Sequence, residues 1–304
     1  MIDISNKIKT LRYAKAQAIV KMNPETQKAI ENGKIEKGDV FEVSRSVAIL
    51  SAKKVWEILP FCHNIPVEWV GVEFKFEGEG ELRIEVEVKS TGKTGCEMEA
   101  LFGVSAAALN VYDMIKPVDK SIEIKEIKLV EKRGGKSDYQ EEIPEGFRAG
   151  VLVISDSISA GKKSDKSGRI IIERLKELGI KDIEYKIVPD ELELIREQVL
   201  GWCDEGFDLV LTTGGTGLSP RDTTPEAIKP IIEKEIPGIM ESSRSYGQER
   251  TPYAMLSRGV AGTKGKTLII TLPGSSRGVE ESMNSLFPYV LHIYKMMQMK
   301  PHKE

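Results

Sequence analysis

Short apolar runs alternate with amphipathic segments throughout the second half of the chain. Four runs are mainly apolar, at residues 150–154, 183–188, 209–211 and 267–272, although the second contains Glu184 and Lys186. Segments near 165–178 and 191–204 have the spacing of amphipathic helices. Strands that are apolar on both faces are typical of a sheet buried between helices. This order predicts an α/β domain with a doubly wound, mostly parallel sheet.

The first half of the chain has a different pattern, in which apolar and polar residues alternate. In the segment 81–89, Leu82, Ile84, Val86 and Val88 fall on one face, and 67–76 is similar. Strict alternation is typical of an antiparallel sheet with one solvated face. Helices are expected to cover the other face, at 10–22, 47–59 and 98–114. We therefore predict an α+β domain here.

A polar segment separates the two patterns. Residues 131–146 are rich in glycine and charge and show no apolar periodicity, which is typical of a linker or terminal arm. The length of 304 residues also exceeds what one ordinary core needs. We predict a first domain at 1–140, a linker at 141–147 and a second domain at 148–304.

Composition narrows the class of protein. The net charge is −3, so no broad basic surface is expected for nucleic acid, although local lysine clusters can bind small anions. The three cysteines have no zinc-ligand spacing, which favours a reducing compartment and argues against a structural metal site. No apolar run has the length of a membrane span, and the N-terminus lacks a signal-peptide core. These features predict a cytoplasmic protein that binds neither membranes nor nucleic acid.

Candidate chemistry in the first half gathers at the ends of the predicted helix 98–114. This helix is apolar nearly all round, yet Glu97 and Glu99 lie at its start and Asp113 and Lys116 at its end. Buried helices normally lack such charges unless they are paired, solvated or functional. Ordinary explanations remain open, because acidic residues suit a helix N-terminus and Asp113 and Lys116 have the spacing of a surface ion pair. The lone His63 is equally compatible with a structural role.

Five motifs in this half, in this order, resemble the MoaC family of cyclic pyranopterin monophosphate synthases. They are Lys-Gly-Asp-Val from residue 37, Cys-His from 62, Thr-Gly-Lys-Thr-Gly from 91 through Glu-Met-Glu-Ala-Leu, Tyr-Asp-Met-x-Lys from 112, and Gly-Gly-Lys-Ser from 134. The resemblance implies a ferredoxin-like fold in a homo-oligomer, a trimer or hexamer, with sites at subunit interfaces. It also implies conversion of 3′,8-cyclo-7,8-dihydro-GTP to cyclic pyranopterin monophosphate and pyrophosphate. No tightly bound cofactor is expected in this domain.

The same resemblance assigns roles to residues. It implies that Asp113 and Lys116 are the central acid/base pair, with Lys37 and His63 beside them. Substrate-binding roles fall to Cys62, to Glu97 and Glu99 for the base, and to Lys53, Lys93 and Lys136 for the phosphates. Positioned proton donors and cations suit a ring rearrangement that expels pyrophosphate. Asn64 departs from the proline that the family commonly has after Cys-His, which affects the expected path of this loop.

Glycine-rich and acidic loops follow the predicted strands of the second half. They contain Asp190, the run Gly214, Gly215, Thr216 and Gly217, then Asp222 and Ser275. The carboxyl ends of parallel strands share one sheet edge, where α/β folds bind ligands. Three ordinary readings stay open: the glycines form a tight turn, Asp190 begins a capping box, and Thr224 caps the next helix. The last reading leaves Asp222 free for a ligand.

The second half resembles the MogA/MoaB family of molybdopterin adenylyltransferases. The resemblance rests on Ile-Ser-Asp-Ser, Asp-Lys-Ser-Gly, Pro-Asp, Thr-Thr-Gly-Gly-Thr-Gly-Leu-Ser-Pro-Arg-Asp, Leu-Ser-Arg-Gly and Leu-Pro-Gly-Ser. It implies that ATP and Mg²⁺ bind here and that AMP is transferred to molybdopterin. Asp190 and Asp222 are implied as catalytic or magnesium-directing residues. Gly214, Gly215, Thr216, Gly217 and Ser275 are implied as phosphate-binding residues.

Two resemblances on one chain predict a bifunctional enzyme of molybdenum cofactor biosynthesis that acts on pterin and nucleotide substrates. The alternative is that only the adenylyltransferase is active and that the first domain is an assembly or binding module. A nucleotide pyrophosphatase on a related domain is a third reading. The sequence Arg-Asp-Thr-Thr-Pro-Glu from residue 221 favours the adenylyltransferase over it.

Overall fold

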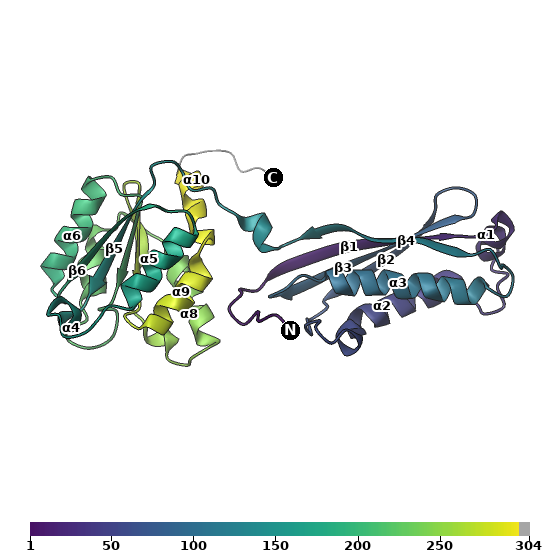
Figure 1. Ribbon diagram of the computed structural model, residues 1–304, viewed down its shortest axis with the longest axis horizontal. Coiled ribbons are helices and arrows are strands. Elements are labelled where there is room, and N and C mark those ends of the chain that lie inside the picture. Colours follow the sequence, from purple (N-terminus) through teal and green to yellow (C-terminus); the bar gives the residue numbers. More distant parts are fainter. Residues whose placement is uncertain (298–304) are drawn as a thin grey trace. The chain divides into compact units, whose positions relative to one another are not determined.

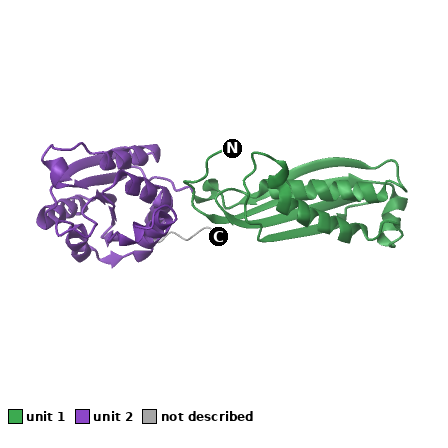
Figure 2. Ribbon diagram, turned by 90° about the horizontal axis from the view of Figure 1, so that it is seen from below, with its two compact units in different colours: residues 1–139 green, residues 140–304 purple. Residues whose placement is uncertain are grey.

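The computed structural model describes residues 1–297 of the chain, so the end of the predicted second domain, 298–304, lies outside the described residues. Contacts divide the chain into two compact units, Met1–Tyr139 and Gln140–Glu304 (Figure 2). Each unit has its own hydrophobic core. Within residues 141–147, Phe147 is buried in the core of the second unit, and the Glu141 carboxylate accepts from His292 Nδ1 at 2.7 Å.

The first unit is a four-stranded antiparallel sheet with its helices on one face (Figure 1). Its strands, in the spatial order β2-β3-β1-β4, are β1 Thr10–Lys21, β2 Trp69–Phe76, β3 Glu81–Gly92 and β4 Glu123–Arg133. Its helices are α1 Pro24–Glu31, α2 Val40–Ile58, α3 Glu97–Ile115 and the short η1 Lys136–Tyr139. The first and third strands are central, as in two interleaved βαβ units. The predicted ferredoxin-like α+β fold is confirmed.

The prediction of a helix at 10–22 is wrong, because this segment is the central strand β1. Its alanines have a high helix propensity, but Ala14, Ala16 and Ala18 fall on alternate positions and are fully buried. Alternation therefore determined the structure, and small side chains on this face let α3 pack closely against the strand. The helix predicted from residue 47 begins at Val40, where the Asp39 carboxylate accepts from two backbone N–H groups.

The second unit is a six-stranded, mostly parallel sheet. Its spatial order is β6-β5-β7-β10-β9-β8, with parallel pairing from β6 to β10 and antiparallel pairing beyond. The strands are β5 Arg148–Ile154, β6 Asp182–Val188, β7 Leu209–Thr213, β8 Lys234–Glu235, β9 Ala261–Lys264 and β10 Thr267–Leu272. The predicted α/β fold is confirmed. Since β6 and β7 lie on opposite sides of β5, the carboxyl edge has the switch point where such sheets bind ligands.

Helices cover both faces of this sheet (Figure 1). One face packs against α5 Ser167–Glu177, α8 Pro237–Gln248, α9 Ser276–Leu286 and α10 Ile293–Met297. The other packs against α6 Leu192–Asp204 and α7 Thr224–Ile228. Short helices connect the rest: α4 Asp156–Ser159, η2 Lys229–Ile231, η3 Ala254–Leu256 and η4 Tyr289–His292. No helix among residues 1–297 combines the length and apolarity that a membrane span requires.

Candidate functional site

The loop after β7, which we call the glycine loop (residues 214–218), leaves no space for β-carbons at its first two positions. Gly214 and Gly215 have φ angles of 107° and 62°, a region that side chains disfavour. A β-carbon on Gly214 would lie 2.1 Å from the carbonyl oxygen of Ile154. One on Gly215 would lie 2.2 Å from Thr224 Oγ1. Glycine is therefore required here by the backbone and its neighbours.

The first four carbonyl groups of the glycine loop are hydrogen-bonded within the protein. Thr224 donates its side-chain hydroxyl to Gly214 O at 2.9 Å and its backbone N–H to Gly215 O at 3.1 Å. Arg258 donates its backbone N–H to Thr216 O at 3.0 Å and its Nε to Gly217 O at 2.7 Å. Two residues thus satisfy four consecutive acceptors.

The N–H groups of the same loop after Gly214, in contrast, have no hydrogen-bond acceptors in the described part of the protein. Within residues 1–297, no protein acceptor receives a hydrogen bond from the N–H of Gly215, Thr216, Gly217 or Leu218. A run of successive backbone donors without protein acceptors forms a concave site for an anion. This arrangement favours phosphate binding over the plain tight turn that the sequence left open.

Carboxylates from the loops after β5 and β6 lie at this edge of the sheet, together with Asp222 from the segment that contains the glycine loop. Asp190 Oδ2 accepts from the backbone N–H of Asp156, and Asp156 Oδ1 accepts from the backbone N–H of Asp190, both at 3.0 Å. Arg221 donates to both oxygens of Asp156, at 3.0 and 2.8 Å, and lowers the pKa of that carboxyl. Burial raises the pKa of Asp190, and the charges of Asp156 and Asp222 raise it further. The edge therefore concentrates negative charge beside the glycine loop.

Two of the ordinary readings left open by the sequence are wrong. The N-cap of α6 is Glu191 and has no side-chain cap, so the Asp190 carboxylate is not used for capping. The N-cap of α7 is Thr223, and Thr224 lies inside the helix with its hydroxyl on Gly214 O. Asp222 instead closes its own turn by accepting from Ser219 N–H at 2.7 Å.

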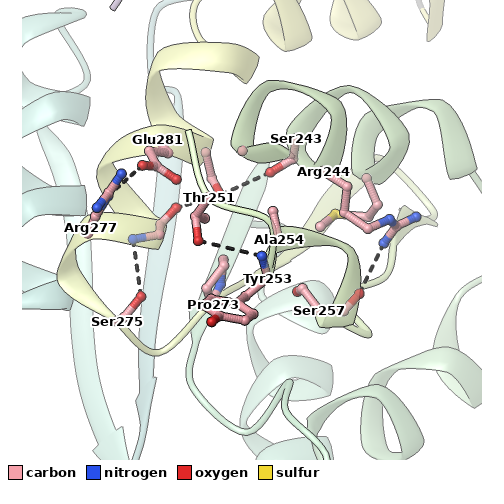
Figure 3. A pocket seen from close by; sticks show the side chains of 14 residues that line it. Ser243, Arg244, Thr251, Tyr253, Ala254, Ser257, Pro273, Ser275, Arg277 and Glu281 are labelled. Atoms are coloured by element: carbon pink, nitrogen blue, oxygen red, sulfur yellow. Dashed lines mark hydrogen bonds and ion pairs between the residues drawn. The ribbon is translucent and has the colours of Figure 1, made fainter. Parts of the chain in front are cut away.

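Ser275 is the N-cap of α9 and borders a cavity of about 310 Å³ (Figure 3). Its Oγ accepts from the backbone N–H of Gly278 at 3.1 Å. The cavity lies between α8, α9 and the segment around η3, and Arg244, Arg277 and Tyr253 are among its lining residues. Gly274 joins the cavity to the glycine loop, since a β-carbon there would lie 3.2 Å from Gly214 Cα.

In the first unit, three of the four predicted acid/base residues, Lys37, Asp113 and Lys116, form one ion-paired group at the end of α3. Lys37 Nζ lies 2.6 Å from Asp113 Oδ2 and 2.8 Å from its carbonyl oxygen. Lys116 Nζ lies 2.7 Å from Asp113 Oδ1. Hydrogen bonds from Lys116 and then Lys37 lower the pKa of Asp113 to about 2. All three side chains are about half exposed and face solvent in a single copy of the chain.

The predicted base-binding residues gather at the other end of α3, around a cavity of about 720 Å³. Cys62, Glu97 and Glu99 line it. His63, expected beside Asp113, also lines this cavity, so in a single copy it lies at the other end of α3 from Asp113. Burial raises the pKa of Glu99 to about 7, and its Oε2 has no hydrogen-bond partner in the part of the chain that the structure describes. Cys62 Sγ lies 3.9 Å from Glu99 Oε1. A buried carboxyl with an unused oxygen on a cavity wall is suited to bind a ligand group.

The three further lysines do not form one cluster. Lys93 follows β3 and donates to Ser5 O at 3.1 Å, while Lys136 follows β4, so both lie at the end of the sheet that carries Glu99. Lys53 is exposed on α2. The buried Arg12 at this end, which donates to Gly92 O at 3.2 Å, was not recognised from the sequence. Arg12 lies in β1, which the sequence predicts as a helix, so its place at this end of the sheet could not be predicted.

The two groups of the first unit are too far apart to act on one ligand within one copy. Residues 99 and 113 lie on a single α-helix, whose rise of about 1.5 Å per residue separates them by about 21 Å. Asn64 is exposed between the cavity residue His63 and Pro66. A site that uses both groups needs a second copy of the chain.

No metal-binding cluster is formed by the protein alone: within residues 1–297, no three His, Cys, Asp or Glu side chains are grouped to hold an ion. Asp190 and Asp222 supply two carboxylates near the glycine loop. A magnesium ion usually takes one or two carboxylates together with substrate phosphates. The donor set therefore fits magnesium only together with a phosphate ligand.

Family models match each half of the chain. Residues 1–135 match the MoaC family, and residues 150–292 match the model described as "Probable molybdopterin binding domain". Together these matches cover all the candidate residues except Lys136.

Curated relatives match either the whole chain or about half of it. The chain is 38% identical over 302 residues to a "Molybdenum cofactor biosynthesis bifunctional protein" of Chlorobaculum tepidum, covering 99% of this chain and 96% of that one. It is 50% identical over 137 residues to a "Cyclic pyranopterin monophosphate synthase" of Brevibacillus brevis, covering 45% of this chain and 86% of the relative. The solved molybdopterin biosynthesis enzyme MoaB of Thermus thermophilus has 44% identity and a TM-score of 0.48, covering 52% of this chain and 99% of that one.

Proposed function

The chain belongs to the family of bifunctional molybdenum cofactor biosynthesis proteins, and we propose that each of its units holds one complete set of reactive groups for one reaction of that pathway. The first unit is the cyclic pyranopterin monophosphate synthase, and the second adenylylates molybdopterin. The sites lie in separate units, so each activity is expected to survive the loss of the other.

For the second unit, the observation that carries the proposal is the run of N–H groups at residues 215–218, without acceptors among residues 1–297, beside Asp190 and Asp222. These donors bind the phosphates of ATP. The terminal phosphate oxygen of molybdopterin attacks the α-phosphorus, the bond from that phosphorus to the bridging oxygen breaks, and pyrophosphate leaves. Positioning and charge neutralisation supply most of the catalysis in such displacements.

We assign Asp190 and Asp222 as the residues that would hold Mg²⁺ with the ATP phosphates. A divalent cation supplies charge neutralisation at the phosphates. It also relieves the repulsion from Asp156 and Asp222 that adds to the raised pKa of Asp190. The cavity bounded by Ser275 is next to the glycine loop, because the neighbouring Gly274 lies against Gly214, and its volume suits the ring system of the pterin substrate.

For the first unit, Asp113 with Lys37 and Lys116 exchanges protons during the ring rearrangement, and His63 assists from the cavity. Glu97, Glu99 and Cys62 bind the base, while Lys53, Lys93 and Lys136 bind the phosphates that leave as pyrophosphate. The low pKa of Asp113 keeps it ionised, so that it holds the ammonium groups of Lys116 and Lys37 in place as proton donors.

The separation along α3 leads to a composite site between two copies. A second copy placed antiparallel brings its Asp113 end beside the Glu99 end of the first, and a two-fold axis completes both sites at once. Exposed apolar side chains along α3, such as Met98, Leu109 and Tyr112, supply a surface for this contact. We therefore propose a homo-oligomer built from such pairs.

The second candidate is that only the adenylyltransferase is active. It is favoured by Asn64, which alters the loop that carries His63. Two assays on the full-length protein separate the candidates. Asp113→Ala is expected to abolish formation of cyclic pyranopterin monophosphate and leave adenylylation intact, and Asp222→Ala to do the reverse. A wild-type protein that is inactive in the first assay would contradict the bifunctional proposal.

A further inference from the structure

The guanidinium of Arg258 contacts both ends of the segment that joins β7 to α7. Its Nε donates to Gly217 O and its Nη2 to the carbonyl oxygen of Asp222 at 2.6 Å, while the backbone N–H of Arg258 donates to Thr216 O. Its Nη1 is ion-paired with Glu226 in the first turn of α7. One side chain thus spans the glycine loop, the Asp222 turn and the following helix.

These contacts determine which way the peptide groups point. A peptide unit is planar, with its C=O and N–H directed oppositely, so fixing the carbonyls toward Arg258 directs the intervening N–H groups away from it. The N–H groups of Gly217 and Leu218 belong to the peptide units whose oxygens accept from Arg258. The bond to Asp222 O holds the backbone from which that carboxylate extends.

We infer that Arg258 is a positioning residue of the adenylyl-transfer site, which holds the glycine loop open toward phosphate without touching the substrate itself. This inference rests on the adenylyltransferase proposed above for the second unit. Planarity and multiple donors suit arginine to this role, because one guanidinium reaches several acceptors in fixed directions. Lysine retains the charge but offers only a compact ammonium group, so it cannot contact Gly217 O, Asp222 O and the Glu226 carboxylate at once.

The neighbouring chain links this residue to the cavity. Ser257 lines the cavity wall, and Arg244 Nη1 lies 3.4 Å from the carbonyl oxygens of both Ser257 and Gly259. Arg258 is therefore held between the cavity on one side and the glycine loop on the other. Loss of its side chain is expected to weaken nucleotide binding first, because Gly217 O and Asp222 O lose their donors, while Thr216 O keeps the backbone N–H of residue 258 and the cavity wall keeps its backbone.

The test compares full-length Arg258→Ala and Arg258→Lys with the wild type. The probe for equilibrium binding is α,β-methylene-ATP with Mg²⁺, and the activity assay gives KM for ATP and kcat. Gly215→Val gives the affinity that remains when the glycine loop is disrupted, since a side chain at this position collides with Thr224. Arg196→Ala is the matched control, because Arg196 is similarly half-buried and pairs with Glu193 at 3.2 Å away from the loop.

We expect Arg258→Ala to raise the dissociation constant and KM for ATP by about tenfold or more, the scale of a small misplacement in a binding site. Arg258→Lys should fall between the wild type and Arg258→Ala, and Arg196→Ala should bind like the wild type. Millimolar methylguanidinium should restore part of the binding to Arg258→Ala. A purely structural role predicts lower unfolding stability with unchanged KM and no rescue.

Unchanged binding in Arg258→Ala would overturn the inference, as would a loss confined to stability. Wild-type binding no stronger than that of Gly215→Val would also overturn it, because there would be no anion loop to position. If the wild type binds the analogue but transfers no AMP, the proposed function fails. In that case the Arg258 inference is decided by the binding comparison alone.

Discussion

Asp156 and Asp190 are joined reciprocally: the carboxylate of each accepts a hydrogen bond at 3.0 Å from the backbone N–H of the other. The pair ties the loop after β5 to the loop after β6, two strands that are neighbours in the sheet. Arg221 neutralises Asp156 from the glycine-loop side. The position of the Asp190 carboxylate is therefore set by Asp156, although the two residues are far apart in sequence.

Asp156→Ala is expected to lower kcat/KM for adenylylation by about 100-fold, the effect of a displacement of about 1 Å at a reacting centre. The change removes the acceptor for Asp190 N–H and the partner of Arg221. The control is Asp182→Ala at the opposite end of β6, where Asp182 is exposed and pairs with Arg148 at 3.4 Å. Adenylylation by Asp156→Ala at the control's rate would show that this link does not position Asp190.

Thr224 provides a second test of the glycine loop. Thr224→Val removes the hydroxyl that donates to the buried carbonyl of Gly214 but keeps the volume and the backbone N–H. An unsatisfied buried acceptor costs roughly 1–3 kcal/mol, so binding of α,β-methylene-ATP should weaken about tenfold. Thr224→Ser keeps the hydroxyl and should bind close to wild-type strength. Calorimetric titration of both variants decides the question, and equal affinities would count against this role.

The buried strands of the second unit can be predicted from the sequence, whereas the central strand of the first unit cannot. The parallel strands β5, β7 and β10 were found because burial on both faces makes them continuously apolar, and β10 was predicted at its observed bounds, Thr267–Leu272. In β1 the alternating alanines carried two signals, helix propensity and a period of two, and only packing against α3 decides between them. Local sequence therefore predicts the buried sheet better than the small-residue strand.

For the sites, sequence predicts residue types but not their partners. The sequence predicts Thr224 as a helix cap. Its hydroxyl instead donates to the carbonyl oxygen of Gly214, because the chain reverses between the glycine loop and α7. Arg258 lies in an irregular segment, so nothing periodic relates it to Asp222. The distance between Glu99 and Asp113 follows from helix geometry, but its meaning depends on a second copy of the chain.

Glu99→Gln should stabilise the first unit at alkaline pH. The folded pKa of about 7 lies above the ordinary value of 4.5, so the folded state binds more protons between these values and its stability falls as pH rises through this window. Removing the charge should recover up to about 3 kcal/mol at pH 8 and little at pH 4. Hydrogen exchange of α3 amides at both pH values measures this. If Glu99→Gln changed the stability equally at both pH values, burial would not raise the pKa of Glu99 in the folded state.

Asp119 should have the opposite pH dependence: it stabilises the first unit at neutral pH and loses this contribution in acid. This buried carboxylate accepts from Asn23, Thr26 and Ser121. Burial alone would raise the pKa of Asp119, but these hydrogen bonds lower it to about 2, below the ordinary 3.8. Its contribution of about 2 kcal/mol is present above pH 4 and is lost as pH falls toward 2. Asp119→Asn should remove this acid-sensitive part of the stability of the first unit. Identical acid unfolding of variant and wild type would contradict the assignment.

The composite site of the first unit predicts complementation between two inactive variants. Asp113→Ala and Glu99→Gln are each expected to lack synthase activity as homo-oligomers. In a mixed pair, one site combines both substitutions, and the other combines the intact Asp113 of one copy with the intact Glu99 of the other.

Mixed pairs should therefore have about half of the wild-type activity, because each has one intact site of two. Differently tagged variants are co-expressed, the doubly tagged species is purified, and cyclic pyranopterin monophosphate formation is measured. The control mixes Asp113→Ala with Lys116→Ala, whose substitutions lie in the same group and leave no intact site in a mixed pair. Equal activity in both mixtures would place the complete site within one copy and contradict the separation argument, whereas restoration only in the first mixture locates the reaction between two copies.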